Sequence, residues 1–501
     1  MIRYFRVFLG MCFIMLMHSC TKDDVVNPTD PDGSTTSEPR VTGIVDCNGS
    51  AGGDSVKVFY RNGSLIEAKK TNLGGGFSFN VPANTDLTLE IELSDASKDT
   101  TIEITSGGKG TLVDVGNIRM CESFDFTKIS AGGAHCLALR SDGTIWAWGN
   151  NSNGQLGVDP TSTPSTALPV RVGNENSWIG IEAGNGFSLG LKFDGSLWAW
   201  GNNSMGQLGD GTTLNQFLAV RVGGTAFFCS QFAAGGNHAL AIRSNGTLWS
   251  WGANDFGQLG NGTINTTANA FPIQIGTSNN WNFVSARVNN SGSINTSGQL
   301  FLWGDNARGQ TCGNMVAFCQ APLIQTLTPT QEYDMLNWTT VSASCTMVGV
   351  TSNGELFGGG DNVNGQLNQQ VITGQGSLPC NFYWNPIKIV AGTGWMKAVN
   401  GIGLNFSLGG AYGGHSLFLR SDGTLWGSGP NQFGALGNGP NAGILQQIGL
   451  DNDWMDIAAG AGFSLMLKSD GTVWSMGKND FGQIGNGITG VNQTTPFRVL
   501  F

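Results

Sequence analysis

One eight-residue phrase recurs seven times along this chain and constrains the fold more than any other feature. Its first copy reads Asp142-Gly143-Thr144-Ile145-Trp146-Ala147-Trp148-Gly149. The seven copies end at Gly149, Gly201, Gly252, Gly304, Gly360, Gly429 and Gly477, so they stand 48 to 69 residues apart. A repeat of roughly 40 to 50 residues is typical of one four-stranded propeller blade. The repeats therefore predict a seven-bladed β-propeller over residues 123–501.

Each repeat carries the local signals of short antiparallel strands. Asp142-Gly143 is a tight-turn dipeptide, because glycine tolerates a positive φ. The alternating strand that follows places Trp146 and Trp148 on one face, where we expect them to pack between blades. A Gly-Gln-Leu-Gly turn comes next, and an apolar strand that ends in small residues, such as Ile129-Ser130-Ala131-Gly132, precedes the phrase.

The fourth strand of each unit bears on how the ring closes. We expect its seven copies to begin near Pro169, Ala219, Pro272, Pro322, Pro386, Leu445 and Pro496. The last copy has no blade after it, and the first unit, which starts at Phe126, has no such strand before it. We therefore predict that the C-terminal strand pairs into the first blade and removes the exposed sheet edges.

These phrases resemble the regulator-of-chromosome-condensation repeat family, and the resemblance spans about 375 residues. The motifs that carry it are Asp142 to Gly149 and Asn153-Gly154-Gln155-Leu156-Gly157. It implies a seven-bladed propeller that serves as a binding surface. Blades four to six depart from the pattern, because Phe357-Gly358-Gly359 replaces the Trp-x-Trp segment and residues 391–405 look like an insertion.

The N-terminus has the layout of a secretory signal. Arg3 and Arg6 precede an apolar run over 7–17, which is too short for a stable membrane span, and Cys20 follows a small residue. This resembles the lipobox of bacterial lipoproteins, in which that cysteine is lipidated and becomes the new N-terminus. We therefore expect residues 1–19 to be a lipoprotein signal peptide and Cys20 to be the lipid attachment site. The alternative is an ordinary cleaved signal with an incidental cysteine.

The residues after Cys20 indicate where the protein is displayed. Thr21-Lys22-Asp23-Asp24 resembles the export tag of surface-exposed lipoproteins in some Gram-negative bacteria, although it would also suit the start of a solvated tether. Residues 20–40 combine prolines with Asp, Ser and Thr and predict a flexible linker. We expect a lipid-anchored protein of the outer membrane that faces the cell exterior.

A small all-β domain is predicted over residues 41–122. Strand-like runs occur at 41–45, 56–60, 76–81, 87–93 and 100–104, with turn residues between several of them. About 80 residues of this kind suit a two-sheet β-sandwich. The pieces Val41 to Val45, Val56 to Val58 and Gly76 to Phe79 resemble the carboxypeptidase regulatory-like domain, a transthyretin-like fold. The resemblance implies a spacer or an accessory module.

Cysteine usage agrees with an exported protein. No Cys-x-x-Cys pair exists in the sequence, so a zinc or thioredoxin-like site has no support. Cys47 and Cys121 lie near the two ends of the small domain, and Cys312 and Cys319 flank a short loop. Both pairs could form disulfides, although spacing alone does not determine connectivity. Cys136 lies in an alternating strand, where we expect a buried thiol.

The sequence offers little support for catalysis. His135, His238 and His415 share one repeat position, which Phe187 and Phe463 occupy in other blades, and a position used three times indicates a structural role. The repeated turn aspartates invite comparison with a glycosidase carboxylate pair, but asparagine replaces two of them. A phosphate-binding loop is absent. We expect no catalytic residue, no cofactor and no metal.

Binding residues are expected on the loops after the Gly-Gln-Leu-Gly turns, which vary most: 158–168, 210–217, 261–270, 311–321, 368–385, 438–444 and 486–495. Phe382, Tyr383 and Trp384 lie in one of them, and Trp395 lies in the apparent insertion. Exposed aromatics there would suit protein hot spots or sugar stacking, or they could simply cover the sides of weak blades.

Charge and location limit the possible partners. The net charge of −10 argues against nucleic acid, whose binders concentrate basic residues. A eukaryotic member of the family exchanges nucleotide on a small GTPase and docks on chromatin, but an acidic, exported protein would meet neither partner. Some secreted bacterial members bind and inhibit enzymes. We expect a monomeric scaffold for an unknown extracellular or periplasmic protein; the alternatives are a glycan-binding module and a propeller enzyme such as a glycan lyase or hydrolase.

Overall fold

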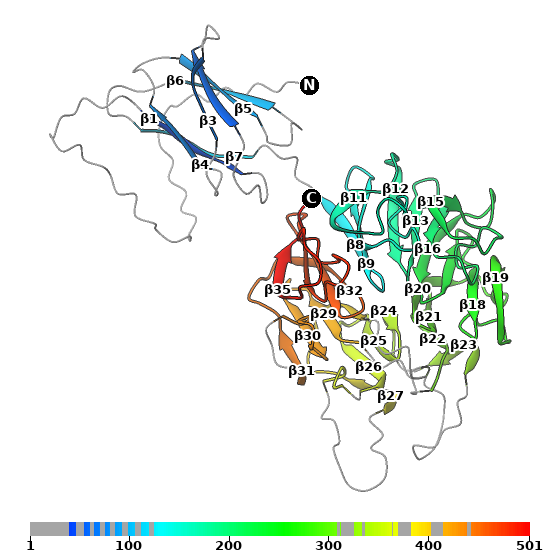
Figure 1. Ribbon diagram of the computed structural model, residues 1–501. Helices are drawn as coiled ribbons and strands as arrows, with labels where there is room; N and C mark the ends of the chain where they lie inside the picture. The colour runs from blue at the N-terminus through cyan, green and yellow to red at the C-terminus, as the bar shows by residue number, and fades with distance from the viewer. Residues whose placement is uncertain are drawn as a thin grey trace. The chain divides into compact units, whose positions relative to one another are not determined.

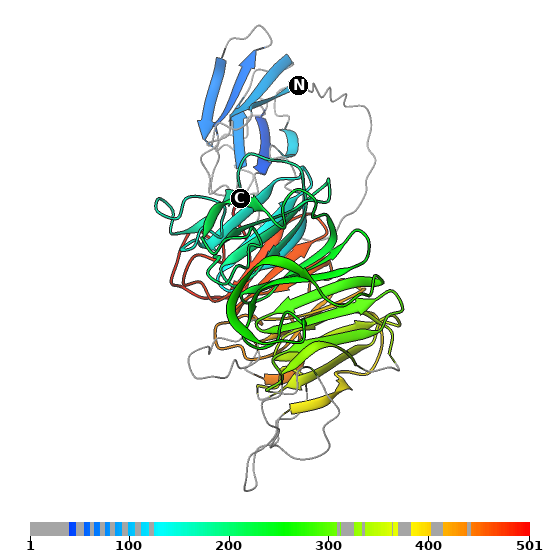
Figure 2. The same cartoon turned by 90° about the vertical axis from the view of Figure 1, so that its right-hand side faces the viewer.

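The chain divides into two compact units, Met1–Ser123 and Phe124–Phe501. The structure, a computed structural model, describes residues 125–501 except 308–310, 312–324, 333–335, 363, 369–381, 402–413 and 438–441. It describes backbone alone for residues 382–385 and 442 and for seven strands of the first unit. Figure 1 shows the strands of both units, and Figure 2 gives the view turned by 90°.

The first unit contains two separate sheets. One has the strand order β4-β1-β7 and the other β3-β2-β5-β6. The seven strands are β1 (Arg40–Asp46), β2 (Ser55–Tyr60), β3 (Leu65–Lys70), β4 (Gly76–Asn80), β5 (Asp86–Glu92), β6 (Asp99–Thr105) and β7 (Leu112–Arg119). The five predicted runs coincide with β1, β2, β4, β5 and β6, and the packing of a sandwich remains a prediction.

The second unit is a seven-bladed β-propeller, as the repeats predict. Each blade is a sheet of four strands that are consecutive in sequence. Blades 1 to 3 contain β8 (Phe126–Ala131), β9 (His135–Arg140), β10 (Ile145–Asn150) and β11 (Ser165–Arg171); β12 (Trp178–Ala183), β13 (Phe187–Lys192), β14 (Leu197–Gly201) and β15 (Gln216–Arg221); and β16 (Cys229–Ala234), β17 (His238–Arg243), β18 (Leu248–Asn254) and β19 (Asn265–Gln274).

The remaining four blades follow the same plan, including the degenerate ones. They contain β20 (Trp281–Arg287), β21 (Asn290–Asn295), β22 (Leu300–Gly304) and β23 (Thr326–Glu332); β24 (Trp338–Ala343), β25 (Thr346–Thr351), β26 (Leu356–Asp361) and β27 (Phe382–Lys388); β28 (Trp395–Asn400), β29 (Ser416–Arg420), β30 (Leu425–Gly429) and β31 (Ala442–Gln447); and β32 (Trp454–Ala459), β33 (Phe463–Lys468), β34 (Val473–Gly477) and β35 (Gln493–Arg498). The first strands of successive blades contact one another around the axis, and β32 returns to contact β8.

The predicted strand exchange between the two ends of the propeller is wrong. β35 pairs with β34 of its own blade, with Trp474 opposite Arg498, and β11 completes blade 1. The proline-containing strand is therefore the last strand of each repeat and not the first. In the same register Pro329 of β23, and not Pro322, corresponds to Pro169.

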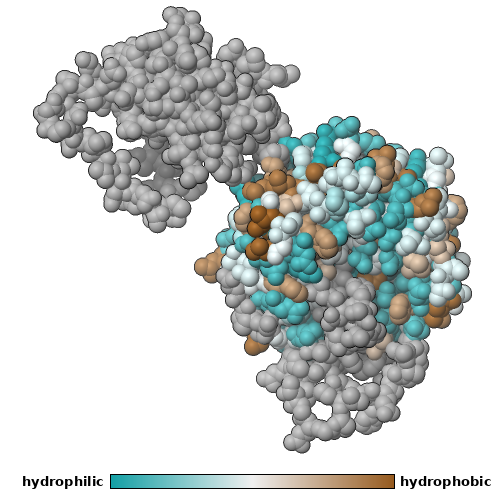
Figure 3. Space-filling model, in the orientation of Figure 1, coloured by the Kyte–Doolittle hydropathy of each residue, from teal (hydrophilic) through white to brown (hydrophobic). Residues whose placement is uncertain are grey.

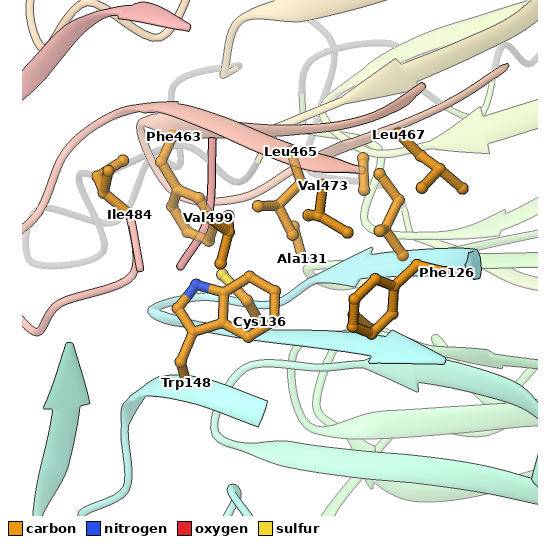
Figure 4. Close-up of a cluster of buried hydrophobic side chains, with 13 residues drawn as sticks. Phe126, Ala131, Cys136, Trp148, Phe463, Leu465, Leu467, Val473, Ile484 and Val499 are labelled. Atoms are coloured by element: carbon orange, nitrogen blue, oxygen red, sulfur yellow. The ribbon is translucent and has the colours of Figure 1, made fainter. Parts of the chain in front are cut away.

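The ring closes where the red strands of blade 7 lie beside the cyan strands of blade 1 (Figure 1). One buried cluster joins Phe126 and Trp148 of blade 1 to Phe463 and Val499 of blade 7 (Figure 4). Phe501 lies against Phe126, with 4.2 Å between ring centroids. The closure depends on apolar packing and does not use an exchanged strand.

Tryptophan links blades 1, 2, 3 and 4 each to the blade before it. The indole N–H of Trp200 donates to the backbone carbonyl of Gln155 at 2.9 Å, and Trp148, Trp251 and Trp303 do the same toward Gln483, Gln207 and Gln258. These four indoles are fully buried. Each repeated glutamine thus supplies a carbonyl acceptor that satisfies a buried donor, which explains why the two motifs recur together.

Candidate functional site

Each of the three histidines faces a serine of the following blade. His135 Nε2 lies 2.9 Å from Ser188 Oγ, His238 lies 2.8 Å from Ser291, and His415 lies 2.8 Å from Ser464. All six side chains are buried. A His–Ser contact of this length is also the geometry of a base and its nucleophile, so the direction of the proton decides its meaning.

In these pairs the histidine donates the hydrogen bond to the serine, which indicates a structural role. Ser188 Oγ donates its only proton to the carbonyl of Gln155 at 2.8 Å, so His135 Nε2 must be the donor toward that serine. Burial lowers the pKa of His135 to about 3, so the ring is neutral at pH 7. A histidine that donates to a serine cannot accept its proton, and both groups are shielded from substrate.

The repeated aspartates serve their own turns. Asp194 Oδ1 accepts hydrogen bonds from the backbone and hydroxyl of Ser196, and that hydroxyl accepts the indole N–H of Trp198. The hydrogen bonds from Ser196 lower the pKa of Asp194. Gly195 completes the turn at φ 81°, which a side chain rarely adopts. The aspartates are thus occupied by hairpin geometry, as the sequence predicts.

A second set of charges lies on the inner strands and departs from the repeat. Arg287 reaches from blade 4 to the carbonyl of Ala131 in blade 1, with 3.1 Å between Nη1 and the oxygen. Glu182 accepts the hydroxyl of Ser130, and its pKa is raised by burial despite the charge of Arg287.

The inner strands also carry a Lys–Asp ion pair. Lys397 of blade 6 binds Asp456 of blade 7. Each of the two inner-strand carboxylates, Glu182 and Asp456, therefore has its own protein partner. This arrangement ties blades together across the ring and does not present a free acid–base pair.

The most prominent exposed feature is an apolar band on the outer edge of blades 7, 1, 2 and 3, which we call the rim band. Its members are Leu168, Leu214, Phe217, Leu218, Ile264, Phe271, Ile488 and Val491, each 41% to 69% exposed. Figure 3 shows hydrophobic side chains along the right-hand edge of the propeller, where Figure 1 labels β18 and β19.

Contacts between successive blades hold the outer loops and strands that carry the rim band against one another. Gly487 of blade 7 donates to the carbonyl of Ala167 beside Leu168, and Gly211 of blade 2 donates to that of Ala270 beside Phe271. Phe217 of blade 2 packs against Gly154 of blade 1. The predicted variable loops contribute six of the eight residues, Leu168, Leu214, Phe217, Ile264, Ile488 and Val491. The others lie on outer strands, where repeat comparison gives exposed Thr or Ile at the matching position in other blades.

Of the predicted aromatic binding residues, Trp395 is buried and does not lie on an exposed loop. Residues 391–405 include the first strand of blade 6, so they are not an insertion. Trp395 is 6% exposed and packs edge-on against Phe418 and Trp426 in the core. Phe382, Tyr383 and Trp384 begin β27, the outer strand of blade 5, and their side chains lie outside the described residues.

Several predicted positions fall outside the described residues: Cys20, Cys47, Cys121, Cys312 and Cys319. Cys136 is a buried free thiol, as expected. Within the described part of the chain no group of three or more His, Cys, Asp or Glu could hold a metal, and no helix has the length and apolar character to cross a membrane.

Comparisons with known proteins agree with the repeat analysis. The chain is 28% identical to the Ultraviolet-B receptor UVR8 of Arabidopsis thaliana over 264 residues, which cover 50% of this chain and 56% of UVR8. It is 32% identical to the Probable E3 ubiquitin-protein ligase HERC6 of Homo sapiens over 199 residues, which cover 38% of this chain and 20% of HERC6. The matches thus span less than two thirds of these relatives.

Solved structures with a similar course of the chain include human WBSCR16, with a TM-score of 0.43 and 20% identity over 77% of this chain and 84% of that one. Prp20p from Saccharomyces cerevisiae gives a TM-score of 0.44 and 18% identity over 75% and 77%.

Family models cover most of the propeller. A model of the RCC1-like domain matches residues 106–409, and models of the Regulator of chromosome condensation (RCC1) repeat match 456–483 and 470–501. More than half of the chain is matched by the first alone, and the seven four-stranded blades agree with it. This chain therefore belongs to the RCC1-like domain family.

Proposed function

We propose that this protein is a lipid-anchored bacterial surface lipoprotein whose monomeric propeller is a scaffold for binding other proteins and has no enzymatic activity. The observation that carries the binding role is the rim band. Eight of the exposed large apolar side chains of the described residues lie on four consecutive blades, and exposed apolar patches mark interaction sites. The histidines, serines and turn aspartates that could support chemistry are bonded within the fold.

The uncharged character of the rim band favours a protein partner over nucleic acid. The four loops that border it, 158–168, 210–217, 261–270 and 486–495, contain Asp159 and Asp210 as their only charged residues. Apolar residues surrounded by Thr and Asn resemble the composition of a protein interface core, which is depleted in charge. Phosphate binding would instead require a basic surface.

The rim band predicts a specific loss of binding. The variant Leu218→Ser with Phe271→Ser should lose partner capture, because two large side chains leave the centre of the band. Full-length protein with an affinity tag inserted in residues 25–40 would be incubated with host and bacterial extracts, and captured proteins would be identified by mass spectrometry. The matched control is Phe193→Ser with Leu450→Ser, which are 78% and 93% exposed outside the rim band. Equal capture by both variants would contradict the proposed surface.

The lipid anchor makes a separate prediction. Metabolic labelling with an alkyne fatty acid should mark the wild-type protein and leave Cys20→Ala unlabelled, because the acyl chain requires the Cys20 thiol. Cys12→Ala, a cysteine of the predicted signal peptide, should keep the label. Labelling of Cys20→Ala at the wild-type level would refute the anchor. Surface display is then checked by adding protease to intact cells.

A further inference from the structure

The outer strands of most blades carry a proline that protects the sheet edge. In matching register these residues are Pro169, Pro272, Pro329, Pro386 and Pro496. Proline lacks an N–H, so an outer strand that contains it is a poor template for a further strand. Two blades lack the proline, and they have Ala219 and Leu445 at this position.

The two proline-free edges differ in how their N–H groups are used. The backbone N–H of Leu445 in blade 6 donates to the side-chain oxygen of Asn368 at 2.6 Å. Ala219 in blade 2 has no side-chain or loop partner of this kind among the described residues. Blade 2 therefore has the one proline-free edge strand of the described propeller whose N–H is not capped in this way.

The loop of the preceding blade lies against β15 at Phe217, through Gly154, but among the described residues it lacks a hydrogen bond that the corresponding loops make to other outer strands. The outer strands of blades 1, 3 and 4 each accept a hydrogen bond from a glycine N–H in the loop of the blade before. The bonds run from Gly487 to Ala167, from Gly211 to Ala270 and from Gly262 to Leu327. In blade 1 the matching loop position is Asp159, followed by Pro160, and no such bond to Phe217 is found in the described chain. The replacement of the loop glycine by Asp159 and the absence of proline at Ala219 thus both affect β15.

The register of β15 directs two donors outward. Val222 donates to the carbonyl of Leu197 in β14, and Val220 lies opposite Ala199. Because alternate residues of an edge strand point away from its partner, the N–H groups of Ala219 and Arg221 face away from the sheet. Phe217 and Leu218 beside them are 41% and 63% exposed.

We propose that β15 binds an extended segment of a partner protein by strand addition, which would make blade 2 a five-stranded sheet. This inference rests on the proposed protein-binding function and specifies its mode. The incoming segment would run antiparallel to β15, since antiparallel pairing is slightly more stable per residue. Main-chain hydrogen bonds would supply affinity, and side-chain contacts would supply specificity.

The chemistry of β15 defines the segment. Leu218 and Val220 share one face of the strand, so the segment should carry apolar residues at alternate positions. Arg221 is the single charged residue of β15. Its Nη2 donates to the carbonyl of Thr225, and its positive charge favours an acidic residue on the segment opposite it. The segment should lack proline where it pairs with Ala219.

A displayed library of random twelve-residue peptides, selected on the full-length protein, provides the test. Selected peptides should be proline-free, alternately apolar and acidic near one end. They should bind wild type and Ala219→Ser equally, and bind Ala219→Pro about tenfold more weakly, because one or two main-chain hydrogen bonds are lost. Ala219→Pro is expected to fold, since five other blades have proline at this position. Hydrogen exchange should slow at Ala219 and Arg221 when peptide binds.

Other outcomes would overturn the proposal. Peptides that bind all three proteins equally, or a selection that yields no Ala219-dependent peptide, would exclude strand addition at β15. A wild-type dimer in light scattering that becomes a monomer in Ala219→Pro would identify a second copy of this chain as the occupant instead. If Ala219→Pro still captures the protein partner while Leu218→Ser with Phe271→Ser does not, the scaffold function stands and strand addition fails.

Discussion

Replacing His238 by Phe together with Ser291 by Ala should remove about one third of the stability that the propeller loses through its histidines between pH 6.5 and 5. The wild-type fold is expected to lose about 2 kcal/mol for each of its three buried histidines over this interval. The double variant copies a pair that the protein already uses, because Phe187 and Ala239 occupy the same positions at the interface of blades 2 and 3.

Stability falls with falling pH because the histidine rings are buried in their neutral form. Burial lowers the pKa of His135 and His238 to about 3, and burial followed by the charge of Arg287 lowers that of His415 to about 4. An unfolded histidine titrates near 6.5 and so binds a proton that the folded ring refuses. The stabilisation is therefore fully present well above pH 6.5 and declines as the pH falls, to about pH 3 for His135 and His238 and about pH 4 for His415.

The surroundings of the histidine side chains also indicate that protonation destabilises the fold. His135 and His238 use Nε2–H toward serine, and their Nδ1 atoms have no hydrogen-bond partner. Gly132 and Gly235 lie directly against these rings. Protonation would therefore place an unpartnered N–H and a charge in the core.

The measurement is the midpoint of urea unfolding as a function of pH, followed by tryptophan fluorescence. The difference between the double variant and wild type isolates the histidine, because carboxylates such as Glu182 contribute equally to both. The reverse replacement, Phe187→His with Ala239→Ser, should increase the pH dependence by a similar amount. An unchanged slope in His238→Phe with Ser291→Ala would contradict the assignment.

Phe501→Ala should destabilise the propeller by about 3 kcal/mol, the usual cost of truncating a packed phenylalanine. Five blades begin with a tryptophan that packs on an aromatic of their third strand, as Trp178 does on Trp200. Blade 1 begins with the smaller Phe126, and Phe501 packs on Phe126, Trp146 and Trp148. Phe501 thus supplies from blade 7 the volume that blade 1 lacks.

A second substitution tests this explanation. Phe126→Trp alone should be destabilising because the site is already full, but in the Phe501→Ala background it should recover part of the loss. The matched case is blade 3, which begins with Cys229 and where Phe227 packs on Trp249 and Trp251, so Phe227→Ala should cost a similar amount. The free energy of unfolding in urea is the measurement at pH 7. Additive effects of Phe126→Trp and Phe501→Ala would show that the two side chains do not share one space.

The way the ring closes shows where reasoning from repeats stops. A repeat has no natural starting point, so the strand that contains Pro169 can be assigned to the beginning of one blade or to the end of another. The hydrogen-bond register decides the matter, because Val170 lies opposite Ala147 of the same repeat. Closure then depends on Phe501, whose contacts lie about 350 residues away in sequence.

The candidate site was partly visible in the sequence. The pairing of His135 with Ser188, and of Phe187 with Ala239, is written in the order of the repeats and could be found by comparing each blade with the next. The sequence around Trp395 looks like an insertion because residues 402–413 interrupt the usual spacing before His415. The exposed edge of β15 is recognised only by comparing blades: the proline is missing, and within the described chain the N–H of Ala219 has no cap and the loop of blade 1 lacks the glycine hydrogen bond. No single motif contains all three.

The number of blades and the hairpin turns can be read from the amino-acid sequence, because the same local pattern recurs seven times and has short-range physical causes. Tertiary structure alone decided which strand belongs to which blade, how Arg287 spans the ring and which outer edge is left without a cap. Those features arise from contacts between residues in different repeats. Their strength depends on distance and orientation in space, which a periodic pattern does not record.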